Sequence, residues 1–515
     1  MGWAEAEKVH ALTRRPAAEP RIPPAAFSSS PVPTSVLAII SRQKLCYHRR
    51  ISRYKTSHGT SRHAAATTRI RARAMASPLD PATSTILIVG GGTWGSSTAL
   101  HLARRGYKNI TVLDPYPVPS AISAGNDVNK IVEQGLFSHD DDDEAYASNA
   151  LLTHAGAAWK TDPVFAPFYH DTGYIMAASD PAAIAALHRR EQPTPKKGFV
   201  ALSSPADFRA TMPAGVLTGD FPGWQGVYKA TGAGWVHARK ALVAAATEAQ
   251  RLGARYVTGD PRGRVDELVV EAGDVRGVRT ADGKVWRTDR TVLCAGASAP
   301  QLLDMRDQLR PTAWTLAHIK MTPEEAKLYK DLPVLFNIER GFFMEPDEDN
   351  HELKMCDEHP GYLNWTEDPK TGRMASLPFA KHQIPLEAEK RARDFLQECM
   401  PHLAKRPFSF ARICWCADTP NRSFIITKHP DHKSLLLAVG ASGHGFMQIP
   451  VIGSYIADAL EDKLDERMKK CWRWRPETAV GRDWKDRQGR WGGTNEVMDF
   501  QDVKEGEWTS IAPML

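Results

Sequence analysis

Two cysteines flank a tryptophan in ARICWCADTP, Ala411 to Pro420. A close pair of thiols can form a disulfide, clamp a metal ion or anchor a cofactor. Zinc needs about four ligands, and no second Cys or His pair follows at zinc-finger spacing, so we expect no metal. If this stretch is a strand, Cys414 and Cys416 share one face, because side chains alternate with a period of two. That arrangement fits inert packing or a nucleophile beneath a cofactor.

A glycine-rich turn earlier in the chain predicts a dinucleotide site. TILIV, Thr85 to Val89, is an apolar run typical of a buried parallel strand. It leads into GGGTWGSSTALHLARRG, where Gly90, Gly92 and Gly95 have G-x-G-x-x-G spacing. These glycines permit a tight turn, close approach of a pyrophosphate and close packing of helix on strand, and the helix N-terminus offers N–H groups to phosphates. The next strand, NITVLD, ends on Asp114, a predicted acceptor for an adenosine ribose.

The later segments favour FAD over NAD. The loop PYPVPSAISAGNDVNK interrupts the alternation of strands and helices, and a helix-like segment, ARKALVAAATEAQRLG, comes only much later. Short strands in GRVDELVVEAGDVRGVRTADGKVWRTDRTVLCAGA follow it. Another glycine-rich turn, with Gly440, Gly443 and Gly445, lies in LLLAVGASGHGFMQIPVIG between a buried strand and a helix expected near Pro450. Its N–H groups are placed to face a flavin ring. An inserted substrate region with a return to the nucleotide domain is typical of flavin oxidases.

Length and composition indicate a globular protein of two or more domains. The chain has 515 residues, of which 42% are hydrophobic and 24% charged. Its longest early apolar run, SVLAII, is far shorter than the roughly 20 residues of a membrane span, so we expect no membrane association. Seven scattered cysteines form no disulfide framework and favour a reducing compartment, which we take to be the cytoplasm. The terminal PML is not a peroxisomal S-K-L.

The first 74 residues differ from the body in charge. They hold 14 Lys and Arg against 3 Asp and Glu, which leaves 52 against 57 in the body, although the whole chain has a net charge of +6. Such a leader has three readings: a transit peptide, which would make the protein mitochondrial, a nucleic-acid arm, or upstream sequence translated in error. We favour the last reading, with Met75 as the true start. The body continues no basic stripe, so we expect no nucleic-acid partner.

Longer strings carry a family resemblance. GTWGSSTALHLARRGY, LDPYPVPSAISAGNDVNK, LRPTAWTL, NIERGFFMEPDE, CDEHPGY and FSFARICWCADTPNRSF, within roughly Ser84 to Trp508, resemble the fungal fructosyl amino acid and fructosyl peptide oxidases, the amadoriases. These are relatives of monomeric sarcosine oxidase among the D-amino-acid-oxidase-like flavoproteins. The resemblance implies a mixed α/β fold (α+β mixed) with a Rossmann-like FAD-binding domain and an inserted substrate domain on an antiparallel or mixed sheet.

The resemblance also implies a domain order, and the composition sets a leader apart from it. We expect a disordered basic leader at 1–80, an FAD-binding domain in three parts at 84–145, 226–305 and 411–465, a substrate domain in two parts at 146–225 and 306–410, and a C-terminal segment at 466–515 that covers the active site.

The implied activity is oxidation of the secondary amine of a fructosyl amino acid or peptide. The products are the amino acid, glucosone and H₂O₂, and the implied partners are a small-molecule substrate and O₂, with the enzyme acting as a monomer. Two alternatives stay open: an oxidase of sarcosine, pipecolate or saccharopine on the same fold, and a flavin-binding protein that has lost catalysis.

Individual roles follow from the resemblance. Matching C-x-x-x-x-T-P assigns a covalent 8α-thioether link with FAD to Cys414 rather than Cys416. Lys354 matches a lysine near flavin N5, where a fixed cation stabilises developing superoxide. Glu358 matches a carboxylate that contacts the sugar, and Arg490 an arginine that grips the substrate carboxylate.

The remaining expected site residues belong to loops and to the substrate wall. Trp314 and His359 are expected either to wall the substrate pocket or to pack in the core. The expected cofactor-binding residues are Gly90, Gly92, Thr93, Trp94, Gly95, Asp114, Asp127, Asn129, Lys130, Val265, Cys414, Gly443, Gly445 and Phe446. Met447 departs from the family, which often has lysine there to help hold the substrate carboxylate. Because a thioether carries no charge, we expect weaker use of small fructosyl amino acids.

Overall fold

The computed structural model describes residues 78–133, 142–191, 198–358, 360–487, 490 and 496–510. The expectations of a disordered leader and of a start at Met75 therefore lie outside the described residues, as does the expectation for His359.

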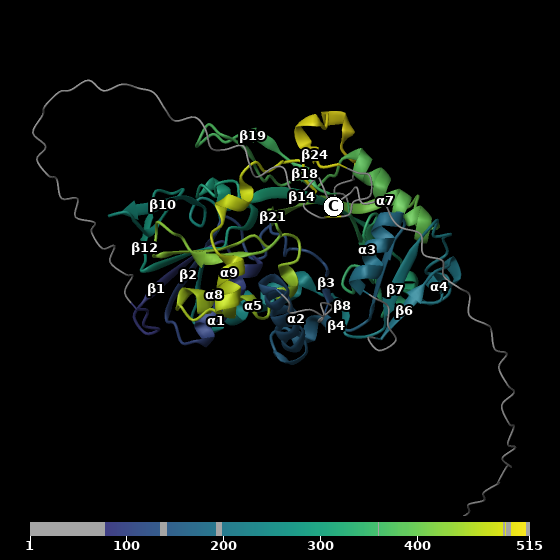
Figure 1. The fold of residues 1–515 in the computed structure, drawn as a ribbon, viewed down its shortest axis with the longest axis horizontal. Helices are drawn as coiled ribbons and strands as arrows, with labels where there is room; N and C mark the ends of the chain where they lie inside the picture. Colours follow the sequence, from purple (N-terminus) through teal and green to yellow (C-terminus); the bar gives the residue numbers. More distant parts are fainter. Residues whose placement is uncertain are drawn as a thin grey trace, which may run out of the picture. The chain divides into compact units, whose positions relative to one another are not determined.

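A six-stranded sheet carries the predicted dinucleotide turn (Figure 1). Its order is β22 (Ile425–Lys428), β23 (Leu435–Val439), β13 (Arg290–Leu293), β1 (Thr85–Val89), β2 (Asn109–Asp114) and β9 (Arg255–Thr258). The pairs from β23 to β9 are parallel, and only β22 is antiparallel to its neighbour. The predicted strands TILIV and NITVLD are confirmed at their predicted bounds.

Three helices pack together beside this sheet. Helix α1 (Thr93–Arg104) contacts both α5 (Ala238–Arg251) and α8 (Ile452–Leu460). Glycines set these distances: a Cβ on Gly95 would lie 1.8 Å from the carbonyl oxygen of Gly90, and one on Gly453 would lie 2.1 Å from that of Ser97. The predicted role of Gly95 in close packing of helix on strand is thus confirmed.

The second large sheet has ten strands. Its order is β24 (Met498–Asp499), β18 (Tyr362–Leu363), β14 (Arg310–Lys320), β17 (Glu352–Asp357), β16 (Gly341–Phe343), β15 (Val334–Asn337), β5 (Tyr174–Ala178), β7 (Gln225–Lys229) and β6 (Phe199–Leu202), with β21 (Phe408–Asp418) paired to β14. Helix α7 (Leu386–Cys399) packs on β17 and β14, and α3 (Pro181–Glu191) packs on β5 and β7.

Strand β21 crosses the predicted domain boundary at residue 411. The whole strand pairs antiparallel with β14 from Arg310 to Ile319. The reason is that 11 consecutive residues, Phe408–Asp418, extend without a turn signal and find a partner of matching length. The division into domains stays a prediction.

Smaller elements complete the described fold. Two three-stranded sheets contain β3 (Lys130–Glu133), β8 (Ala233–Val236) and β4 (Tyr169–His170), and β10 (Val265–Glu271), β11 (Asp274–Thr280) and β12 (Val285–Arg287), while β19 (Trp365–Glu367) pairs with β20 (Met374–Ser376). The other helices are α2 (Asp143–Thr161), α4 (Pro205–Arg209), α6 (Pro323–Leu328) and α9 (Glu466–Trp472).

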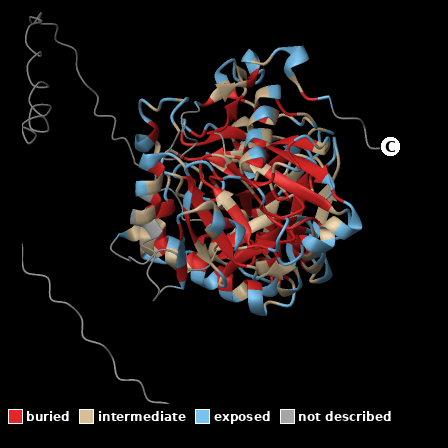
Figure 2. Cartoon of the chain, turned by 90° about the vertical axis from the view of Figure 1, so that its right-hand side faces the viewer, coloured by how far each residue is buried: buried red, intermediate tan, exposed pale blue. Residues whose placement is uncertain are grey.

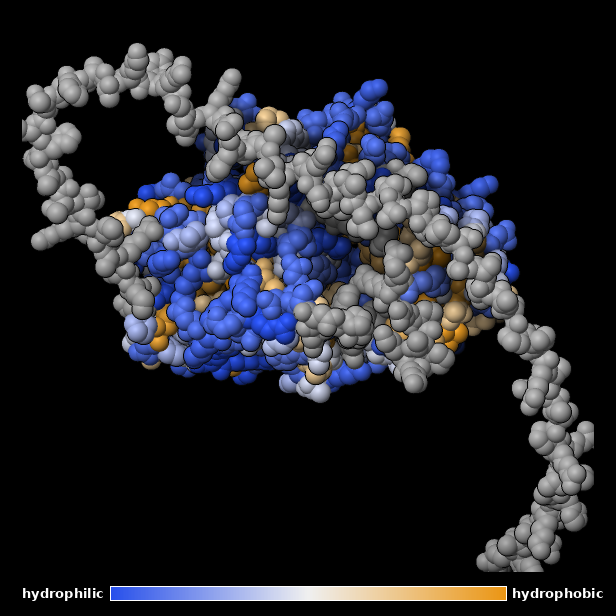
Figure 3. Space-filling model, in the orientation of Figure 1, coloured by the Kyte–Doolittle hydropathy of each residue, from blue (hydrophilic) through white to orange (hydrophobic). Residues whose placement is uncertain are grey.

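Burial follows the two large sheets. Figure 2 shows buried residues along the strands and exposed residues on the outer helices and loops. Strands β1 and β23 are buried along almost their whole length, as expected for strands covered on both faces. The face in Figure 3 is mainly hydrophilic, with small groups of hydrophobic residues. Within the described part of the chain, every helix is too short or too polar to cross a membrane.

Candidate active site

A cavity of about 1190 Å³ opens where the six-stranded sheet meets the ten-stranded sheet. The carboxyl ends of β1, β2 and β23 contribute Val89, Asp114 and Val439 to its wall. Strands β14 and β21 of the larger sheet contribute Trp314 and Cys414 from the other side. Ligands of open α/β sheets bind beyond the carboxyl ends of the strands, so the topology puts this cavity where a dinucleotide is expected.

The first wall is the N-terminus of α1. Gly92 is its N-cap, no side chain caps it, and its first turn has no acidic residue, so its amides are open to an anion. Asp114 accepts hydrogen bonds from the amides of Gly91 (2.8 Å) and Tyr116 (2.9 Å). Burial nevertheless raises the pKa of Asp114. The indole Nε1 of Trp94 donates to the Gly445 carbonyl at 3.2 Å and so connects this turn to the later glycine-rich turn that contains Gly440, Gly443 and Gly445.

These residues fit an FAD molecule by shape and by donor set. A Cβ on Gly92 would meet no heavy atom closer than the Ser123 Oγ at 3.3 Å, so the backbone there lies open to a phosphate. Gly90, Gly92 and Thr93 line the same cavity as Asp114 and Gly445. Amides, a carboxylate and a second glycine turn on one large cavity match the phosphate, ribose and ring parts of a dinucleotide.

The wall formed by the large sheet carries thiols. Cys414 and Cys416 of β21 both line the cavity, which confirms that they share one face of a strand. Cys356 of β17 lines it too, and burial raises the pKa of its thiol to about 11. All six described cysteines are free. Among the described residues, the one cluster spaced to hold a metal ion is His237, Asp347 and Asp349, which contains no cysteine.

Two lysines share the buried carboxylate of Asp127: Lys130 lines the cavity, and Lys354 lies behind the wall. The Lys354 Nζ donates to Asp127 Oδ2 (2.7 Å) and to the Asn129 carbonyl (2.9 Å), and the Lys130 Nζ lies 2.7 Å from the same oxygen of Asp127. Burial alone would raise the pKa of Asp127, but Lys130 and Lys354 hold it well below its usual value. The pKa of Lys130 is raised, because Asp127 and the thiols outweigh the burial of its ammonium. The Lys354 Nζ also lies 5.6 Å from the centroid of the Phe342 ring.

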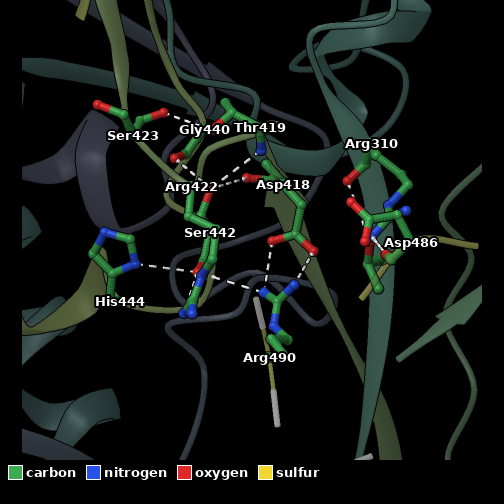
Figure 4. Close-up of polar contacts among 12 residues, drawn as sticks. Arg310, Asp418, Thr419, Arg422, Ser423, Gly440, Ser442, His444, Asp486 and Arg490 are labelled. Carbon is green, nitrogen blue, oxygen red and sulfur yellow. Dashed lines mark hydrogen bonds and ion pairs between the residues drawn. The ribbon is translucent and has the colours of Figure 1, made fainter. Parts of the chain in front are cut away.

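An ion pair between Arg490 and Asp418 lies at the cavity wall. Arg490 donates to Asp418 through Nη1 and Nη2, both at 2.9 Å, as Figure 4 shows with dashed lines. Its guanidinium carbon lies 4.7 Å from the centroid of the Trp314 ring. Burial would raise the pKa of Asp418, but Arg490 lowers it overall. The guanidinium is therefore held by a carboxylate at its end and by an indole on its face.

Glu358 lies beside this ion pair on the cavity wall. Burial raises its pKa to about 7, against the opposing attraction of Arg490 and Arg422. The neighbouring Asp357 adds to the rise, although Arg391 is bound to that carboxylate through Nε (2.9 Å) and Nη2 (2.7 Å). Glu358 is thus an acid whose ionisation falls near neutral pH.

The structure gathers most of the expected site residues. Those that line the cavity are Gly90, Gly92, Thr93, Trp94, Asp114, Lys130, Val265, Trp314, Glu358, Cys414, Gly443, Gly445, Phe446, Met447 and Arg490. Gly95, Asp127, Asn129 and Lys354 are not on the wall. Gly95 packs within the turn, and the other three form the buried layer behind it.

Sequence reasoning missed several wall residues and the carboxylate behind them. Cys356, Arg422 and His444 line the cavity, and Asp418 holds Arg490, yet none of them was assigned a role. Cys356, Asp418 and Arg422 lie within the sequence strings that carry the resemblance. The pairing of Asp418 with Arg490, however, joins residues that are 72 positions apart. No local pattern reports a pair at that separation.

Comparison with known proteins agrees with this site. A family model described as FAD dependent oxidoreductase matches residues 85–459, and the chain belongs to that family. FAD is accordingly its cofactor, and the expected fold class is confirmed.

Three relatives show which kinds of oxidase the chain is similar to. The chain is similar in structure to fructosyl amine:oxygen oxidoreductase (Amadoriase I) from Aspergillus fumigatus, with 58% identity and a TM-score of 0.82 over 85% of this chain and 100% of that one. Fructosyl peptide oxidase from E. terrenum is 34% identical, with a TM-score of 0.74 over 84% and 99%. L-saccharopine oxidase from Schizosaccharomyces pombe is 28% identical over 82% of this chain and 98% of its own. The family resemblance read from the sequence is confirmed.

Proposed function

We propose that this enzyme oxidises the secondary amine of fructosyl amino acids or fructosyl peptides. The observation that carries the proposal is the meeting of Glu358, Arg490 and Trp314 on one cavity wall beside the dinucleotide turn. A polyol needs acceptors for several hydroxyl groups, and an amino acid needs a cation for its carboxylate. The names of the solved relatives, fructosyl amine and fructosyl peptide oxidases, support the same substrate class.

The overall reaction balances with O₂ and water. The C–N bond of the secondary amine is oxidised to an imine, water hydrolyses the imine to the free amino acid and glucosone, and O₂ is reduced to H₂O₂. FAD, when bound, accepts the two electrons from the substrate and passes them to O₂. The protein contributes orientation and charge. Ionised Glu358 accepts hydroxyl hydrogens of the sugar, and Arg490 holds the carboxylate end, so the amine lies between them.

The buried lysines supply fixed positive charge. Lys354 and Lys130 share Asp127, so these three residues together keep one net positive charge beside Cys414, with Lys130 on the cavity wall and Lys354 behind it. A fixed cation stabilises negative charge that develops as O₂ is reduced. We assign that role to Lys354, and we assign the covalent thioether to FAD to Cys414, which lines the cavity.

A peroxide assay across a substrate panel tests the function. We expect H₂O₂ from fructosyl-valine or ε-fructosyl-lysine at rates well above those from sarcosine, pipecolate and saccharopine. The saccharopine arm matters because one curated relative is an L-saccharopine oxidase. Turnover of saccharopine or sarcosine alone would replace the proposal with the amine-oxidase alternative. Bound FAD that no member of the panel reduces under anaerobic conditions would indicate lost catalysis.

We also propose a monomer that works in the cytoplasm. The free state of the six described cysteines supports a reducing compartment. Sedimentation of the purified enzyme and fractionation of the cells that make it test the two parts separately.

A further inference from the structure

Arg422 and Ser442, two residues with left-handed backbone, are in contact beside Arg490. Arg422 has φ 60° and Ser442 has φ 48°, a region that residues other than glycine rarely adopt. The turn that holds Arg422 closes with a hydrogen bond from its amide to the Thr419 carbonyl at 3.1 Å. The Ser442 amide donates to the Ala417 carbonyl at 3.0 Å, so both turns are fixed to the end of β21. Such strain persists where the surrounding structure enforces it, commonly at functional sites.

The strained turns aim several donors at one carbonyl. The Ser442 carbonyl accepts from His444 Nδ1 at 3.1 Å, from Arg422 Nη2 at 3.3 Å and from Arg490 Nη2 at 3.5 Å. Figure 4 shows these three side chains around it. Gly443, with φ +85°, leaves room: a Cβ there would lie 3.5 Å from Arg490 Nη2 and 4.0 Å from Arg422 Nη2. Two guanidinium groups therefore converge on one point of the cavity wall.

Four arginines lie around this point, together with Glu358, Asp418 and other carboxylates. Asp418 is paired bidentately with Arg490, and two further arginines approach it: Arg310, which donates to the Trp484 and Asp486 carbonyls, and Arg482, which donates to the Asp307 and Asp418 carbonyls. These carbonyls accept hydrogen bonds from the Nη atoms of both arginines, and Asp307, Asp483 and Asp486 offset part of the positive charge. Arg310 and Arg482 are not on the wall, whereas Arg422 and Arg490 line the cavity.

We propose that Arg422 is a second carboxylate-binding residue, which grips the substrate carboxylate together with Arg490 and thereby sets the preference for carboxylated amines. A carboxylate has two oxygens with about four acceptor positions, enough to receive donors from two guanidinium groups at once. Met447, on the same cavity, contributes no charge. This inference rests on the proposed function for the identity of the substrate, but not for the presence of an anion site.

His444 is uncharged near neutral pH and adds no positive charge to this group of arginines. Burial lowers the pKa of the imidazole to about 3, and Arg422 lowers it further. Since Nδ1 faces the Ser442 carbonyl, Nδ1 carries the proton and Nε2 is an acceptor. The ring is thus neutral and offers no third cation for the carboxylate.

The kinetic test compares two substrates that differ only in the carboxylate. Fructosyl-glycine carries it, and fructosyl-ethylamine has a methyl group in its place. In Arg422→Met we expect kcat/KM for fructosyl-glycine to fall by about 10- to 100-fold, mainly through KM, because a charge-assisted hydrogen bond is lost. The value for fructosyl-ethylamine should stay within about threefold of that of wild type. Arg422→Lys should recover part of the loss, since it keeps the charge but not the planar fork.

The control is Arg482→Lys, a change in the same arginine cluster but away from the cavity wall. It should leave the ratio between the two substrates unchanged. Equal losses on both substrates in Arg422→Met, or no loss on fructosyl-glycine, would overturn the proposal. Flavin content, read from the visible absorbance, separates a failure to fold from a failure to bind.

An acetate titration tests the anion site without any turnover. We expect acetate to perturb the flavin absorbance of the wild-type holoenzyme and to bind about 10-fold more weakly to Arg422→Met. Unchanged acetate affinity in that variant would contradict the proposal even if the fructosyl substrates react. A wild-type enzyme that binds acetate through Arg422 but oxidises no fructosyl amine would instead refute the proposed function and leave the anion site standing.

Discussion

Glu358 makes activity depend on pH near neutrality. Burial raises its pKa to about 7, so the carboxylate is mostly protonated at pH 6 and mostly ionised at pH 8. If the ionised form accepts the sugar hydroxyls, kcat/KM should rise as pH increases through about 7 and then level off. A pH profile of kcat/KM with a fructosyl substrate measures this.

The matched variant is Glu358→Gln, which keeps the size of the side chain but cannot ionise. It should lower kcat/KM by about 10- to 100-fold, because neutral hydrogen bonds replace charge-assisted ones. Its profile should lose the rise near pH 7. A profile that keeps the same inflection in Glu358→Gln would assign it to another group.

Asp418 is a positioning residue for Arg490, and its removal should affect both stability and binding. Asp418→Asn leaves a buried guanidinium without its bidentate partner, and breaking such a pair typically costs about 3–5 kcal/mol. We expect the free energy of unfolding to fall accordingly and KM for fructosyl-glycine to rise more than kcat falls. The control, Asp304→Asn, removes the exposed partner of Arg373 and should change stability by about 1 kcal/mol or less. Stability equal to that of wild type in Asp418→Asn would count against the role given to the pair.

Lys354 should matter for O₂ more than for the amine substrate. Its ammonium is fixed by Asp127 and the Asn129 carbonyl and lies off the cavity wall, so contact with a bulky substrate is not its role. In Lys354→Met we expect stopped-flow reoxidation of the reduced flavin by O₂ to slow by about 100-fold or more, with a much smaller effect on anaerobic reduction. Equal slowing of the two half-reactions would refute the assignment.

At the scale of elements, the turn from β1 to α1 requires a glycine at position 95, because no space is left for a side chain there. In Gly95→Ala the new Cβ would lie 1.8 Å from the Gly90 carbonyl oxygen, so helix and strand must separate. We expect lower FAD content and a lower melting temperature, because the amides of the turn no longer converge on the phosphates. Gly506→Ala, where a Cβ would meet nothing within 4 Å, is the control. Normal FAD content in Gly95→Ala would show that the turn tolerates the shift.

This turn was predictable because its signals are local. Apolar strand, spaced glycines and acid lie within one short segment, and each has a stereochemical reason. The pairing of β21 with β14 brings together residues about 100 positions apart, so no periodicity in either strand reports it. The same separation hid the Asp418–Arg490 pair and the meeting of Arg422 with Arg490 at Ser442. The resemblance supplied Arg490 itself, but not the carboxylate that holds it.

At the scale of the whole molecule, the cavity lies between two hydrophobic cores, and each core contains residues that are far apart in the sequence. Ile88 and Val112 of the six-stranded sheet belong to one hydrophobic cluster, and Ala313 and Ile413 of the ten-stranded sheet belong to another. The cavity wall takes residues from both sheets. A molecule of FAD bound there would contact residues of both sheets, and its binding to the native state would stabilise both parts of the protein together.

A covalent link at Cys414 would make that stabilisation independent of free FAD. In the wild type we expect the yellow colour to stay with the polypeptide after acid denaturation, and the melting temperature to ignore added FAD. In Cys414→Ser the colour should be released, and added FAD should stabilise the protein by about 2.7 kcal/mol at a free concentration 100-fold above its Kd. Cys416→Ser, a change two residues along the same face of β21, is the control and should keep its FAD bound in acid. Free FAD from the wild type, or retained FAD in Cys414→Ser, would refute the link, and release from Cys416→Ser alone would move it to the second thiol.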